Sequence, residues 1–121
     1  MYTCQKADEY IEKNRVDRAD KPEFHLTTPV GWLNDPNGFS IYGGKAHLFY
    51  QFHPYSTEWG PMHWGHSTSD DFIRWEELPT ALAPDSDYDA FGCFSGTAIE
   101  NDGKHVLFYT CLLYTSDAAD D

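Results

Sequence analysis

The fold of this chain is decided by residues 39–52, which read FSIYGGKAHLFYQF. Apolar and aromatic side chains fill both halves of the stretch, and the pair Gly43-Gly44 separates them. Residues 39–42 and 46–52 therefore have the composition of strands, and a Gly-Gly link between two such runs is typical of a tight antiparallel turn. The stretch predicts a β-hairpin.

More segments rich in β-branched and aromatic residues follow this hairpin, separated by turns that contain proline and aspartate. None of them carries a sustained period of 3.6 residues, which would indicate a helix. The further predicted strands are residues 62–67, 73–75, 94–100 and 105–110. We therefore expect an all-β fold from Phe24 onward.

One strand-forming sequence occurs twice. GKAHLFY at residues 44–50 is echoed by GKHVLFY at residues 103–109, which lies 59 positions later. Both copies follow a predicted strand and a glycine turn. This pattern is typical of the blades of an antiparallel β-propeller, and fewer than three repeats do not close a core. The echo therefore predicts that the chain is one part of a longer propeller.

The composition excludes several kinds of partner. The chain has 121 residues, of which 20 are acidic and 8 basic, so its formal charge is −12. That balance leaves too little basic surface to bind the phosphates of a nucleic acid. No apolar run approaches the roughly 20 residues of a membrane span, and the start lacks a signal-peptide pattern. We expect neither a nucleic-acid nor a membrane partner, and a cytoplasmic location.

The first 23 residues are polar and charged, unlike the rest. Two structures fit residues 1–23, namely a solvated leader or a short helix over residues 6–15 with exposed faces all round. At the other end, residues 111–121 read CLLYTSDAADD. This tail resembles a translation of the transposon-end adapter used in sequencing libraries, so we expect it to be non-native. Resequencing of the source locus would test this.

The histidines and cysteines give no pattern of a metal site or a disulfide framework. The three cysteines have no CxxC spacing, so neither a zinc site nor paired disulfides are expected. His63 and His66 lie three residues apart, which places them on opposite faces of a strand. We expect no metal and no cofactor.

The segment with the densest chemistry is WLNDPNG at residues 32–38. Pro36 disfavours a helix at Asp35, and the Asn-Gly pair after it is a turn signal, so we expect Asp35 on a tight, rigid loop. Asn34 and Asn37 offer amide donors that would hold the carboxylate ionised. A positioned, ionised aspartate is what nucleophilic catalysis of glycoside hydrolysis needs. The alternative is an Asx-turn that only caps a strand.

Three other segments carry groups that suit a carbohydrate. Gln51 lies among aromatic residues in FYQFHP, and its amide can bond the hydroxyls of a polyol. Trp59 opens the segment WGPMHWGH, and an indole face can stack on the C–H surface of a sugar. Phe94 and Ser95 lie between glycines in FGCFSG. Each segment alone is also compatible with a core strand or a turn.

Taken in order, these motifs resemble the N-terminal part of glycoside hydrolase family 32. The resemblance runs from about Phe24 to Thr110 and also includes SDDFIRW at residues 69–75. It implies a five-bladed β-propeller followed by a β-sandwich, with residues 24–110 as about one and a half blades. It further implies a fructose-releasing enzyme acting on sucrose or sucrose 6-phosphate with retention of configuration.

The resemblance also implies roles for single residues. Asp35 matches the nucleophile that attacks the anomeric C2 of a terminal fructosyl unit. Asn34 and Gln51 match residues that hydrogen-bond the fructose. Trp59 matches the aromatic wall of the fructose subsite, and Phe94 and Ser95 match a pair of residues that contact the substrate.

The sequence departs from the family pattern at two catalytic motifs. It contains neither the Arg-Asp-Pro motif nor the Glu-Cys motif that holds the general acid/base, since Glu100 precedes Asn101. General acid catalysis contributes about 10² to 10⁴-fold to such reactions. We therefore expect this chain alone to be inactive. Two other readings remain open, a non-catalytic carbohydrate-binding β-domain and a generic all-β interaction domain.

Overall fold

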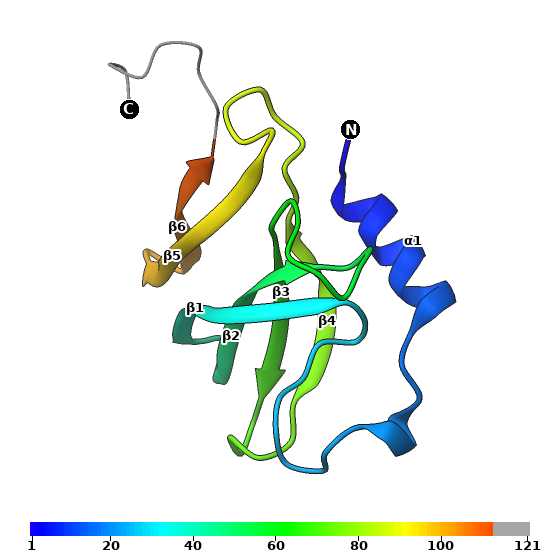
Figure 1. Cartoon of the computed structure of the whole chain (residues 1–121). Coiled ribbons are helices and arrows are strands. Elements are labelled where there is room, and N and C mark those ends of the chain that lie inside the picture. The colour runs from blue at the N-terminus through cyan, green and yellow to red at the C-terminus, as the bar shows by residue number, and fades with distance from the viewer. Residues whose placement is uncertain (113–121) are drawn as a thin grey trace.

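The computed structural model describes residues 1–112, in which six antiparallel strands follow a short helical segment. The helices are α1 (Cys4–Asn14) and the 3₁₀ helix η1 (Arg18–Asp20), and the strands are β1 (Trp32–Tyr42), β2 (Lys45–His53), β3 (His63–Ser69), β4 (Glu76–Leu82), β5 (Gly92–Asn101) and β6 (Lys104–Leu112). Strands β1 to β4 form one sheet in chain order, and β5 pairs with β6 in a second sheet (Figure 1). The predicted all-β class is confirmed.

The two hairpins close with the same kind of turn. Gly43 and Gly44 have φ of 60° and 77°, and Asp102 and Gly103 have φ of 51° and 75°. Two successive residues with positive φ are the mark of a two-residue type I′ turn, which matches the twist of the flanking strands. The echoed sequences therefore occupy equivalent places, since β2 and β6 are each the second strand of such a hairpin.

Strand β2 is buried on both faces, which explains its nearly continuous apolar sequence. Successive side chains of a strand point to opposite faces. On one face Phe49 packs with Trp64 and Cys93, between the sheet and the β5–β6 hairpin. On the other face Tyr50 and Phe52 pack against the N-terminal segment.

The N-terminal segment contains the helix α1, and one face of this helix is packed against the rest of the structure. Ala7 and Ile11 of α1 lie one turn apart on the same face, and both are buried. The Asp8 carboxylate accepts a hydrogen bond of 2.8 Å from the backbone N–H of Thr80 in β4. The expectation of a helix exposed all round is therefore wrong, because two buried apolar side chains and one hydrogen bond to β4 hold α1 in place.

The strand expected over residues 73–75 is also wrong. Asp71 Oδ1 accepts from the backbone N–H of Ile73 and of Arg74, and the Ser69 hydroxyl accepts from that of Phe72. These side chains take the donors that a strand would offer to its neighbour. The hydrogen bond donated by the backbone N–H of Arg74, followed by that from Ile73, lowers the pKa of Asp71 to about 2. The segment is therefore a turn, and β4 begins at Glu76.

Only the first two residues of the predicted non-native tail lie in the described part of the chain. Residues 111 and 112 complete β6, and the remaining residues of the tail, 113–121, lie outside the described part of the chain.

Histidine burial makes the stability of this fold depend on pH. His63 is fully buried beside the ring of Tyr55, and burial lowers its pKa to about 4. Because an unfolded histidine titrates near 6.5, the unfolded state binds more protons between pH 6.5 and pH 4. The free energy of unfolding therefore falls as the pH drops through this window, and it is fully retained above pH 6.5.

We predict that His63 alone lowers the free energy of unfolding by about 2 kcal/mol between pH 7 and pH 5. Thermal denaturation of the protein at a series of pH values measures this. His63→Gln should remove this contribution and leave that of His66, whose pKa burial also lowers to about 4. A pH dependence that is the same in the wild type and in His63→Gln would refute the assignment.

Candidate active site

Asp35 lies inside a strand, at a point where the strand bulges. Leu33 pairs with Phe52 and Pro36 pairs with Tyr50, so β1 has one more residue than β2 between these pairs. A β-bulge of this kind turns a side chain away from its regular direction and is common beside active sites. The expected tight loop is therefore replaced by a bulge in β1, and the Asp35 side chain is exposed there.

Strand β5 has the same irregularity at the corresponding place. Cys93 pairs with Cys111 and Gly96 pairs with Tyr109, which leaves one extra residue in β5. Ser95 lies in this second bulge, and its Oγ donates a hydrogen bond of 3.2 Å to Asp35 Oδ2. The two bulges thus bring together two side chains that are 60 residues apart in the chain.

The asparagines beside Asp35 have other partners than expected. Asn34 Oδ1 accepts a hydrogen bond of 2.8 Å from the Trp32 indole N–H. Asn37 is buried, and its Nδ2 donates to the carbonyl of Pro36. The prediction that these amides hold the carboxylate is not what the structure shows, because the donor on Asp35 is the Ser95 hydroxyl. Asn37 instead supports the neighbouring strand.

The Gln51 side chain links strand β2 to β1 and β5. The side chain is 3 % exposed, and its Nε2 donates to Asn37 Oδ1 at 2.9 Å and to the Cys93 carbonyl at 3.0 Å. An amide nitrogen has two hydrogens, and both are used within the protein. Gln51 can therefore offer a ligand its Oε1 as an acceptor, while its N–H groups are engaged within the protein.

Only one of the two indoles in the WGPMHWGH segment is presented to solvent. Trp59 is 52 % exposed, and its ring meets that of Phe94 edge-on with centroids 6.2 Å apart. Trp64 is fully buried, and its Nε1 donates to the backbone carbonyl of Phe94 at 2.9 Å. Trp59 thus offers a face for stacking, while Trp64 fixes the strand that carries Phe94 and Ser95.

The predicted site residues line a single cavity. It has a volume of about 360 Å³ and is lined by seven residues: Asn34, Asp35, Gln51, Trp59, Phe94, Ser95 and Thr110. The first six are those expected from the sequence. A carboxylate, amides, a hydroxyl and aromatic faces around one open cavity form the kind of surface that recognises a polyhydroxylated ring.

Thr110 is the lining residue that the sequence reasoning missed. The repeated sequence nevertheless indicates this residue, because Thr110 lies 59 positions after Gln51, the same offset that separates the two copies. Both residues occupy the same position in the second strand of their hairpin, and both face the cavity. The repeat therefore held a signal for the site as well as for the fold.

Within residues 1–112, no group of three or more histidine, cysteine, aspartate or glutamate side chains is arranged to hold a metal ion. The described segment also contains no helix that is long and apolar enough to cross a membrane.

Comparison with known proteins places this geometry in a family. The model of the N-terminal domain of glycosyl hydrolases family 32 matches residues 25–120, which is most of the chain. The chain belongs to glycosyl hydrolase family 32. The resemblance that the sequence motifs indicated is therefore confirmed.

Several members of family 32 are closely similar to the chain. The sucrose-6-phosphate hydrolase of Escherichia coli is 51 % identical over 100 residues, a match that covers 83 % of this chain and 21 % of that protein. The levanase of Bacillus subtilis is 44 % identical over 123 residues, covering 97 % of this chain and 18 % of that protein. The chain thus spans about a fifth of the length of these relatives.

A solved structure shows the same similarity in three dimensions. A mutant of a Bombyx mori family 32 β-fructofuranosidase, in complex with sucrose, matches with a TM-score of 0.85 and 46 % identity, covering 95 % of this chain and 24 % of that one. The sheet of β1 to β4 is accordingly one blade of a β-propeller, and the β5–β6 hairpin is the beginning of the next.

Proposed function

We propose that the full-length protein carrying this segment is a β-fructofuranosidase, which releases fructose from sucrose or sucrose 6-phosphate. Residues 24–110 would supply the first part of its catalytic propeller. The observation that carries the proposal is the cavity in which Ser95 holds Asp35 beside Gln51 and Trp59. Similar proteins bear the names sucrose-6-phosphate hydrolase and β-fructofuranosidase, which supports this substrate class.

The proposed reaction is a double displacement with Asp35 as the nucleophile. The Ser95 hydroxyl binds Oδ2, so that Oδ1 is left to attack the anomeric C2 of the fructosyl unit. The bond from C2 to the leaving oxygen breaks, and a general acid protonates that oxygen. Water then hydrolyses the fructosyl ester and configuration is retained. In this proposal Trp59 packs against the sugar, and Asn34, Gln51, Phe94 and Ser95 position it.

The general acid/base would be supplied by chain beyond this segment. We therefore propose that the 121-residue chain by itself does not cleave sucrose. Fructose release from sucrose should be measured for the full-length protein and for this chain. Release by the full-length protein alone supports the proposal, and turnover by the isolated chain would contradict it.

A non-catalytic carbohydrate-binding β-domain is the second candidate, and the exposed indole of Trp59 favours it. The same assay separates the two functions. Calorimetric binding of sucrose by the full-length protein without any release of fructose would establish the binding domain and refute the hydrolase.

The hydrogen bond from Ser95 to Asp35 should contribute measurably to catalysis. Hydrogen bonds to charged groups contribute about 1.5–3 kcal/mol, so Ser95→Ala should lower kcat/KM for sucrose by about 10 to 100-fold. Steady-state kinetics of the full-length protein check this. Ser86→Ala is the matched control, because the Ser86 hydroxyl bonds to Asp85 outside the cavity. An unchanged kcat/KM in Ser95→Ala would show that the bond has no catalytic role.

A further inference from the structure

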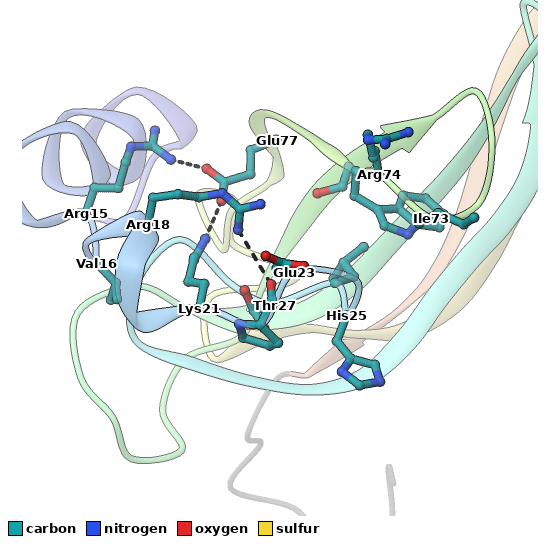
Figure 2. A pocket seen from close by; sticks show the side chains of 14 residues that line it. Arg15, Val16, Arg18, Lys21, Glu23, His25, Thr27, Ile73, Arg74 and Glu77 are labelled. Atoms are coloured by element: carbon teal, nitrogen blue, oxygen red, sulfur yellow. Dashed lines mark hydrogen bonds and ion pairs between the residues drawn. The ribbon is translucent and has the colours of Figure 1, made fainter.

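A second and larger cavity lies away from Asp35. It has a volume of about 510 Å³ and is formed between the segment that follows α1 and the outer strand β4 (Figure 2). We call it the leader pocket, and its lining includes Arg15, Arg18, Lys21, Arg74, Trp75 and Glu77. It shares no lining residue with the cavity that contains Asp35.

The leader pocket gathers an unusual share of the positive charge of the chain. Its lining contains all three arginines and one of the five lysines, which is half of the eight basic residues. Only two acidic residues, Glu23 and Glu77, line it, so the lining residues carry a net charge of +2, while Glu12 and Asp71 contact Arg15 and Arg74 from outside the lining. Because the whole chain carries −12, this is a local reversal of sign that attracts anions.

The cations of the leader pocket are not all neutralised by its acids. Arg15 and Lys21 both contact Glu77, and Lys21 Nζ lies 2.7 Å from Glu77 Oε1 (Figure 2). Arg18 has no carboxylate partner among the described residues, and its Nη1 donates to the Pro22 carbonyl at 3.5 Å. A guanidinium has five N–H donors, so Arg18 keeps most of its hydrogen-bonding capacity for a ligand.

Arg74 is a further arginine of the pocket lining. It lies in the turn before β4, far from Arg18 in sequence, and its Nη1 is 3.2 Å from Asp71 Oδ2. One carboxylate contact leaves its other donors available. Two guanidinium groups that approach a cavity from separate segments suit the several oxygens of a phosphate, which arginine binds in a bidentate manner.

The size and walls of the leader pocket indicate a ligand larger than a phosphate ion. Ligand pockets have volumes of about 300–1,000 Å³, and apolar groups of Ile73 and Trp75 line this one beside the cations. An indole and an aliphatic side chain can cover the C–H surface of a sugar ring. We propose that the leader pocket binds a phosphate monoester of monosaccharide size, with Arg18 and Arg74 on the phosphate.

The test is a calorimetric titration of the full-length protein with glucose 1-phosphate, with glucose and inorganic phosphate as comparison ligands. Glucose 1-phosphate should bind most tightly, inorganic phosphate more weakly, and uncharged glucose not measurably. Saturating fructose, which would occupy the Asp35 cavity, should leave the titration unchanged. Glucose binding with the same affinity would overturn the proposal, and so would competition by fructose.

Variants then locate the binding. Arg18→Gln should raise the Kd for glucose 1-phosphate about tenfold or more, because it removes a charge-assisted hydrogen bond. Lys104→Gln, at the β5–β6 turn, removes the same charge outside the pocket and should leave the Kd within about twofold. An equal loss of affinity in both variants would indicate only long-range attraction between the ligand and the protein's positive charges, and it would overturn the proposed site. Thermal denaturation of Arg18→Gln confirms that the variant is folded, and Arg74→Gln provides an independent second substitution with the same expected loss.

Discussion

Replacing Asp35 with asparagine should abolish the release of fructose from sucrose by the full-length protein and leave its fold intact. The amide has nearly the same shape as the carboxylate but cannot form the fructosyl ester. Removal of a nucleophile from an enzyme lowers kcat by about four to six orders of magnitude. Steady-state kinetics with sucrose measure the loss, and we expect Asp35→Asn to fall within this range.

Two controls make the Asp35 result specific. The side chain is exposed, and among the described residues its Oδ2 accepts a hydrogen bond from the Ser95 hydroxyl alone, so the thermal midpoint of the variant should differ little from that of the wild type. Asp87→Asn removes a carboxylate from an exposed position outside the cavity and should keep its activity. Turnover of Asp35→Asn within tenfold of the wild type would show that the nucleophile lies elsewhere.

Most of the fold could be predicted because it depends on local signals. The glycines of the Gly43-Gly44 turn adopt the positive φ that the turn type needs, and the repeated Leu-Phe-Tyr strand follows each turn. The prediction failed at residues 73–75, where the side chains of Ser69 and Asp71 bond the backbone. Side-chain capping competes with strand pairing, and hydrophobic pattern alone does not reveal which of the two prevails.

The residues that line the Asp35 cavity could be predicted from the sequence, but their geometry could not. Sequence motifs identified the six residues that line the Asp35 cavity together with Thr110. The bulges that place Asp35 beside Ser95 depend on the register of two strand pairs, which no single segment encodes. The leader pocket was not predicted for the same reason. Arg18 and Arg74 line the same cavity only because α1 and the segment after it pack against β4.

Gly96→Ala should be strongly destabilising. Gly96 pairs with Tyr109 between β5 and β6, and an added Cβ would collide with the carbonyl oxygen of Phe108 and lie 2.6 Å from the Cα of Tyr109. These are backbone atoms, which cannot rotate away as a flexible side chain can. The two strands must separate to admit one methyl group, and we expect a loss of about 3 kcal/mol or more in the free energy of unfolding.

The same substitution should also disturb the proposed active site, because Gly96 follows Ser95 directly. Separation of β5 from β6 would move the Ser95 hydroxyl away from Asp35, so kcat/KM for sucrose should fall at least as far as in Ser95→Ala. Thermal denaturation and steady-state kinetics of the full-length protein measure the two effects. Thr97→Ala, at an exposed position next along β5, should change neither by much. A Gly96→Ala variant that is destabilised but retains kcat/KM would show that the β5 bulge does not set the position of the nucleophile.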